Sequence, residues 1–126
     1  QPQGRADFPT SPARVAEAAA AIDAAQNLVG RDCNNIMSVM AEGRELTTEE
    51  RARNKGNLSF AVKMARKSTD LLFESVGGAG LTNASMTQRF WRDLHSASKH
   101  IILNWDMCST LYGRLSLVLP SGTAQF

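Results

Sequence analysis

Two histidines carry the clearest potential for acid–base chemistry, and they lie close together in the second half of the chain. His95 and His100 are the only imidazoles among 126 residues, and a neutral imidazole can accept or donate a proton near pH 7. Within one helix they would lie about 140° apart, so we expect neither a shared small site nor a metal pair. His100 is the stronger catalytic candidate, whereas His95 is expected at the surface or an interface.

His100 has Asn104 one helical turn further along the same edge of the predicted helix. An imidazole and an amide at the border of a buried face can point into a crevice between helices. On the residues alone, a structural role is the favoured interpretation, with His100 hydrogen-bonded to a neighbouring helix. A simple interhelical hydrogen bond is the alternative for Asn104 as well.

The element expected to position these residues is a long helix with one apolar face. Asn83 or Ser85 can cap its start, and Pro120 follows its end. We expect the apolar stripe to be largely buried, partly by another protomer, and Trp105 to pack on it. The stripe advances in steps of three or four residues, as in an amphipathic helix: Phe90, Leu94, Ala97, Ile101, Trp105, Cys108, Tyr112, Leu115 and Leu119.

A first long helix is predicted from Ser11-Pro12 to about Ala41. Ser11 can cap its amides, and Pro12 suits the first helical position. Its alanine run favours helix and lets a neighbouring helix come close. Gly43 is a plausible C-terminal cap.

A second helix begins at a capping box, with Thr47 as N-cap and Glu50 three residues on. Helical spacing of apolar residues continues to the Gly77-Gly78 pair, where a left-handed residue costs little. The helix also carries basic residues that we interpret as a solvated face: Arg51, Arg53, Lys55, Lys63, Arg66 and Lys67.

No segment alternates with period two over a useful length, so we predict an all-α chain. Residues 11–120 should form an antiparallel up-down bundle of three long helices, with a linker at 1–10 and a tail at 121–126. Hydrophobic residues make up 43% of the sequence and the net charge is +2. A net charge this small does not predict binding to nucleic acid or to an anionic membrane.

Cys33 and Cys108 fall on apolar helical stripes without metal-like spacing. They read as reduced thiols in a cytoplasmic protein, and we expect no metal site. No signal peptide is visible, and no apolar run is long enough to span a bilayer.

Three sequence runs carry a family resemblance: GGAG at residues 77–80, RFWRDLHSASKH at 89–100 and NWDMCSTLYGR at 104–114. They resemble the end of the acyl-CoA dehydrogenase superfamily. More narrowly, they resemble its two-component, reduced-flavin-dependent monooxygenases, which hydroxylate phenols, steroid rings or thiophenes. The resemblance covers roughly residues 12–119 and is specific from Gly77 to Arg114. It implies the C-terminal helical domain of a longer enzyme, an incomplete four-helix bundle that assembles as a dimer of dimers.

The resemblance also implies site residues. Gly77, Gly78 and Gly80 match a glycine turn that lies near the adenosine half of FAD, although on residues alone this turn is a helix C-cap and hinge. Glu74 stands where the family usually has a glutamine, and a carboxylate beside a pyrophosphate is unfavourable. A reduced flavin, FMN or FAD, is the implied cofactor, and FMN would not need that contact.

His100 matches a histidine that faces the flavin in the monooxygenases. Its implied role is to hydrogen-bond the flavin C4a-hydroperoxide, or to orient and deprotonate a phenolic substrate, with Asn104 and Trp105 as substrate-binding residues. The common dehydrogenases carry Tyr-Glu-Gly-Thr at this place, and their glutamate removes the substrate's α-proton. Residues 98–101 read Ser-Lys-His-Ile and offer no such base.

A hydroxylase therefore fits best, with O2, a small aromatic substrate and a separate flavin reductase as partners. Two alternatives stay open. One is an acyl-CoA dehydrogenase with its catalytic base on another helix. The other is a non-catalytic helical oligomerisation module.

Overall fold

A computed structural model describes residues 10–122. The long helices are α1 (Thr10–Ala41) and α2 (Thr48–Val76), followed by two shorter ones, α3 (Met86–Ala97) and α4 (Trp105–Ser116). Two short 3-10 helices, η2 (Gly77–Leu81) and η3 (Ile101–Leu103), precede α3 and α4. No strand occurs within residues 10–122, so the all-α prediction is confirmed. The predicted linker and tail lie largely outside the described residues.

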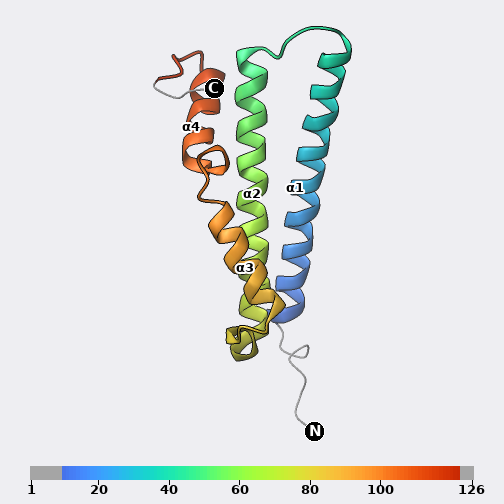
Figure 1. Cartoon of the computed structure of the whole chain (residues 1–126), viewed down its shortest axis with the longest axis vertical. Helices are drawn as coiled ribbons and strands as arrows, with labels where there is room; N and C mark the ends of the chain where they lie inside the picture. The colour runs from blue at the N-terminus through green and yellow to red at the C-terminus, as the bar shows by residue number, and fades with distance from the viewer. Residues whose placement is uncertain (1–9, 123–126) are drawn as a thin grey trace.

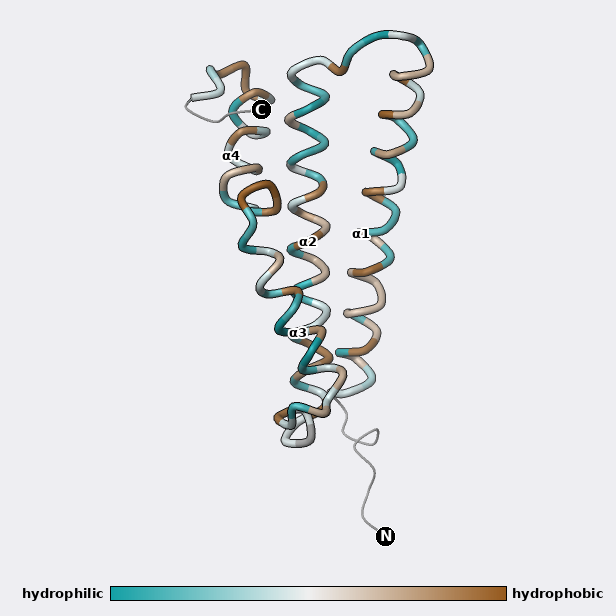
Figure 2. The backbone as a smooth tube through the Cα atoms, viewed as in Figure 1, coloured by the Kyte–Doolittle hydropathy of each residue, from teal (hydrophilic) through white to brown (hydrophobic). Residues whose placement is uncertain are grey.

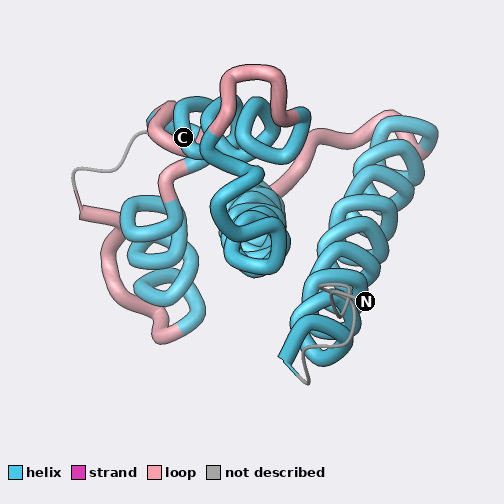
Figure 3. The backbone as a smooth tube through the Cα atoms, turned by 90° about the horizontal axis from the view of Figure 1, so that it is seen from below, coloured by secondary structure: helices cyan, strands magenta, loops and turns pink. Residues whose placement is uncertain are grey.

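The helices form a row with α2 in the middle. Helix α1 runs antiparallel to α2 on one side, and α3 and α4 run along its other side (Figure 1). The view from below shows the same order, with α1 set apart from α3 and α4 (Figure 3). This arrangement leaves much of each outer helix without a neighbour.

Local signals fixed most helix ends as predicted. The Thr47 side chain accepts from Glu50 N at 3.1 Å while Thr47 N donates to Glu50 Oε2 at 2.9 Å, which completes the capping box. Gly43 and Gly77 have φ values of +70° and +60° at the ends of α1 and α2. Ser85 caps α3. Helix α1 is already formed at Thr10, so Ser11 is not its cap.

Glu50 also takes part in a charged network at the α1–α2 connection. Arg44 donates to both Glu50 oxygens at 2.9 Å and to Glu42 at 3.1 Å. The Arg44 side chain, followed by the Thr47 amide, lowers the pKa of Glu50 to about 2. Hydrogen bonds to Glu50, and next to Glu42, raise the pKa of Arg44.

The single long helix predicted from about residue 85 to Leu119 is wrong, because the chain breaks it at residues 98–104. Ser98 Oγ donates to the carbonyl of His95 at 2.9 Å, and Asn104 Oδ1 accepts from Met107 N at 3.1 Å to cap α4. Polar side chains that bond nearby backbone groups compete with helix continuation. His100 therefore has an extended backbone, with φ −61° and ψ 136°, and the 140° argument for a continuous helix does not apply.

Small side chains build the buried interior. Ala18, Ala25, Ala52 and Ala61 are buried together with Ser59 and Ser68. Ser68 Oγ donates to the carbonyl of Ala18 at 3.1 Å, from α2 to α1. These residues let the backbones of the helices approach closely.

Large apolar side chains are conversely exposed. Phe90 and Ile101 are 58% and 60% exposed, so these two members of the predicted stripe are not buried within residues 10–122. Cys108, another member, is buried together with Leu111. Cys33 is exposed, although it falls on an apolar stripe of α1. Figure 2 shows hydrophobic segments at the α3–α4 connection and after α4. Within residues 10–122, no helix is long and apolar enough to cross a membrane.

Candidate functional site

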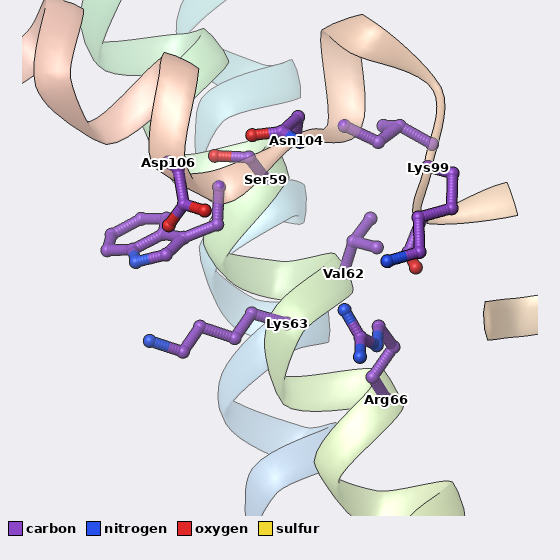
Figure 4. Close-up of a pocket in the computed structure, with 10 residues that line it drawn as sticks. Ser59, Val62, Lys63, Arg66, Lys99, Asn104 and Asp106 are labelled. Carbon is purple, nitrogen blue, oxygen red and sulfur yellow. The ribbon is translucent and has the colours of Figure 1, made fainter.

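A cleft of about 280 Å³ lies between the middle of α2 and the segment that connects α3 to α4 (Figure 4). From α2 it is lined by Ser59, Val62, Lys63 and Arg66, and from the connection and the start of α4 by Ser98, Lys99 and residues 103–106. The cleft exists because the chain leaves the helix at Ser98 and re-enters it at Trp105.

Asn104 and Trp105, both predicted to bind substrate, line this cleft. Asn104 uses its side-chain oxygen to cap α4, which leaves its amide nitrogen as the group that can reach a ligand. Trp105 is half-buried, with its ring centroid 5.3 Å from that of Phe60. The ammonium of Lys63 lies 5.0 Å from the Trp105 ring centroid, which is a cation–π distance.

His100 is exposed and lies next to the cleft residue Lys99 in sequence, but it does not line the cleft itself. Its Nδ1 lies 3.4 Å from the amide nitrogen of Ile102, which donates to it. In the neutral ring this contact leaves the proton on Nε2, which has no hydrogen-bond partner among residues 10–122. His100 thus presents an available donor at the surface of this chain.

The three glycines predicted to contact the cofactor lie far from His100, at the other end of α3. That helix has 12 residues, or a length of about 18 Å. Gly77 has a positive φ, which favours glycine, and a Cβ on Gly80 would lie 3.3 Å from side-chain atoms of Phe73 and Val76. A Cβ on Gly78 would meet nothing within 4 Å. Backbone conformation and packing therefore explain two glycines, and Gly78 leaves space for a close approach.

The sequence and the fold both match known proteins. A family model described as the acyl-CoA dehydrogenase C-terminal domain matches residues 3–105, most of the chain. The chain belongs to that family.

Three relatives of this acyl-CoA dehydrogenase-type domain are informative. The oxygenase component of an FADH2-dependent resorcinol hydroxylase from Rhizobium sp. is 38% identical over 93% of this chain and 30% of its own length. The crystal structure of 3-HSA hydroxylase from Rhodococcus sp. RHA1 matches with a TM-score of 0.84 and 33% identity, over 90% of this chain and 30% of that one.

XiaF from Streptomyces sp., solved in complex with FADH2 and glycerol, matches with a TM-score of 0.89 and 26% identity, over 97% of this chain and 31% of that one. The chain thus spans about 30% of the length of the relatives it matches.

Sequence reasoning missed three basic residues that this domain brings together. Lys63 and Arg66 were assigned to a solvated face of α2, whereas both line the cleft with Lys99. Arg66 Nε is buried and has no hydrogen-bond partner in the described part of the chain, and such a donor costs about 1–3 kcal/mol. The spacing of Lys63 and Arg66, three residues apart on a helix, was the available signal.

His95 was expected at the surface or an interface; it is partly exposed, and its ring also contacts α2. Its Nε2 lies 2.8 Å from Asp70 Oδ1, and the same oxygen accepts from Trp91 Nε1 at 2.7 Å. Trp91 also contacts two rings: His95, tilted, at a centroid distance of 4.3 Å, and Phe73, stacked, at 5.5 Å. His95 therefore ties α3 to α2 and holds the helix that leads into residues 98–104.

Proposed function

We propose that this chain is the C-terminal helical domain of the oxygenase component of a reduced-flavin-dependent monooxygenase. The full-length protein would use O2 to hydroxylate an aromatic or polycyclic substrate. The observation that carries the proposal is the match, over at least 90% of the chain, to proteins named as hydroxylases. The absence of a carboxylate at residues 98–101 supports the same choice, because an acyl-CoA dehydrogenase would need another base for the α-proton.

His100 is the proposed catalytic residue of this domain. A bound reduced flavin would supply the electrons that activate O2. The contribution of His100 would be a hydrogen bond from Nε2 to a reacting oxygen, or the orientation and deprotonation of a phenolic hydroxyl by the imidazole. Its exposure and its free Nε2–H fit the first task directly, because that group can donate to a reacting oxygen. Deprotonation would need the other tautomer, in which Nδ1 carries the proton and no longer accepts from Ile102 N.

The glycine turn is the proposed flavin contact, with Gly78 as the position that allows the closest approach. Glu74 does not stand unpaired beside it, because its carboxylate lies 3.4 Å from the guanidinium of Arg14. This pairing reduces the repulsion of a phosphate that Glu74 would otherwise cause. Both FMN and FAD are compatible with the turn.

The proposed partners follow from the same assignment. A separate reductase would supply the reduced flavin, and a homo-oligomer, a dimer of dimers, would cover the exposed apolar residues of the outer helices. Met37 and Met40 on α1 are 69% and 67% exposed. Side chains of this kind on one helix face are typical of a surface that another chain or segment covers.

The test is hydroxylation by the full-length protein supplied with chemically reduced FMN or FAD. A panel of phenols and polycyclic phenols would be incubated under ¹⁸O2, and products would be analysed by mass spectrometry. We expect a product that contains one atom of ¹⁸O. Oxidation of an acyl-CoA thioester without oxygen incorporation would instead establish the dehydrogenase.

A further inference from the structure

The cleft between α2 and the α3–α4 connection carries more positive than negative side chains among the described residues. Three cations line it, Lys63, Arg66 and Lys99, against a single carboxylate, Asp106. None of the three has an ion-pair partner within residues 10–122. Elsewhere on α1 and α2, by contrast, Lys67 pairs with Glu17 at 2.6 Å and Arg14 pairs with Glu74.

The charges are also distributed unevenly along the cleft. Arg66 and Lys99 lie at one end, and Asp106 lies at the other (Figure 4). Lys63 is placed over the ring of Trp105, so part of its charge is already engaged by an aromatic face. An anion at the Arg66–Lys99 end would meet two unpaired cations and would stay away from Asp106.

We infer that this cleft binds an oxyanion, a carboxylate or a phosphate, belonging to a ligand whose remaining part extends toward Trp105. A guanidinium is the side chain best matched to a planar or tetrahedral oxyanion, and the guanidinium of Arg66 has no ion-pair partner within residues 10–122. Lys99 immediately precedes His100 in sequence, so this end of the cleft is the one nearest along the chain to the candidate catalytic histidine.

The identity of the ligand rests on the proposed function. Within it the oxyanion has two sources: the phosphate of the flavin, or a carboxylate carried by the aromatic substrate. Two pairs of probes differ only in that group. FMN differs from riboflavin by its phosphate, and 3,5-dihydroxybenzoate differs from resorcinol by its carboxylate.

The experiment measures equilibrium binding of these four probes to the full-length protein by calorimetry, without O2 and with the flavins reduced. The variants are Arg66→Gln and Lys99→Gln. Because Arg66 is partly buried, Lys99→Gln at an exposed position provides the variant least able to disturb folding. Lys67→Gln is the matched control, since it removes a charge from the same helix outside the cleft.

We expect each cleft variant to weaken binding of the anionic member of one pair by about tenfold, as for the loss of one charged hydrogen bond. Its neutral counterpart and the Lys67→Gln protein should be unaffected. A selective loss for FMN identifies the flavin phosphate, and a selective loss for dihydroxybenzoate identifies the substrate. Unchanged binding, or equal losses for both members of each pair, would overturn the inference.

This outcome is independent of the proposed activity, because no turnover is measured. A protein that discriminates between the probes but does not hydroxylate would retain the anion site and lose the monooxygenase assignment.

Discussion

A single carboxylate oxygen of Asp70, on α2, contacts the ring nitrogens of two side chains on α3. Trp91 Nε1 and His95 Nε2 lie 2.7 and 2.8 Å from Asp70 Oδ1. We predict that Asp70→Ala destabilises α3 by about 1–2 kcal/mol, because it leaves two partly buried polar groups unpaired. Amide hydrogen exchange of α3 measures the change.

Asp93→Ala is the control for Asp70→Ala. Asp93 lies on α3 itself and makes an exposed ion pair with Arg89 at 3.7 Å, an interaction worth at most about 1 kcal/mol. Equal acceleration of amide exchange in the two variants would show that the Asp70 contacts stabilise α3 no more than an exposed ion pair does.

Single residues were predictable where their role is local. The cap formed by Thr47 and Glu50 and the positive φ of Gly43 and Gly77 depend on neighbours within a few positions, and sequence spacing shows these directly. Asp70 and His95 are 25 residues apart, and no local pattern reports such a contact. In the basic cleft, the spacing of Lys63 and Arg66 is local, but Lys99 comes from the distant α3–α4 connection, and no local pattern reports its approach.

At the level of elements, the prediction failed where side chains compete with the backbone. The apolar spacing from Phe90 to Leu119 is helical throughout, so periodicity alone favours one helix. Ser98 and Asn104 instead bond nearby backbone groups and interrupt it. Val118 was likewise unexpected, since a β-branched residue with φ 58° is rare.

The contact of α2 with α4 depends on a glycine. A Cβ on Gly56 would lie 3.1–3.3 Å from the Cβ, Cγ and Cδ1 atoms of Tyr112, so α4 would have to move. We predict that Gly56→Ala lowers the free energy of unfolding by about 1–3 kcal/mol through overpacking. Urea unfolding midpoints provide the measurement.

Gly30 offers the matched substitution for Gly56→Ala. It lies inside α1, and a Cβ there would meet nothing within 4 Å. Gly30→Ala should therefore stabilise the chain by about 0.5–1 kcal/mol through helix propensity. The account of α2–α4 packing would be wrong if both alanine variants were stabilising.

The α1–α2 connection should respond to acid through Glu50. Its pKa in the folded chain is about 2, below the ordinary value of 4.5, so its contribution to stability is present above pH 4.5. That contribution is lost as the pH falls toward 2, because protonation removes the bonds from Arg44 and Thr47.

We therefore predict that Glu50→Gln flattens the fall in stability between pH 4.5 and 2. Urea unfolding at several pH values measures this slope. Glu49→Gln, in the same first turn of α2, should retain the slope of the unsubstituted chain. An unchanged slope in Glu50→Gln would mean that other carboxylates govern acid unfolding.

At the scale of the whole molecule, the sizes of the buried and exposed side chains are unusual. Small residues are buried between the helices, and large ones such as Phe90, Met37 and Ile101 are exposed. From the sequence, another protomer was expected to cover part of the apolar stripe, and the family resemblance implied an incomplete four-helix bundle. Within residues 10–122 the side chains of Phe90, Met37 and Ile101 stay mostly uncovered, so the described residues do not identify a partner.

We predict that the full-length protein self-associates and that these exposed residues become protected from solvent in the assembly. Sedimentation velocity tests the association, and hydroxyl-radical footprinting of Met37 and Phe90 tests the protection. A protein that remains monomeric at micromolar concentration, with both side chains modified, would refute this prediction.

The central claim is that the domain contributes His100 to hydroxylation, and the full-length His100→Ala protein tests it most directly. Product and hydrogen peroxide would be measured together, with reduced flavin, O2 and a substrate of the unsubstituted protein. We predict that product formation falls by about 10²–10⁴, as for the loss of a positioned acid–base group, while peroxide release continues and the exposed substitution leaves thermal unfolding nearly unchanged. Hydroxylation at the unsubstituted rate would contradict the claim.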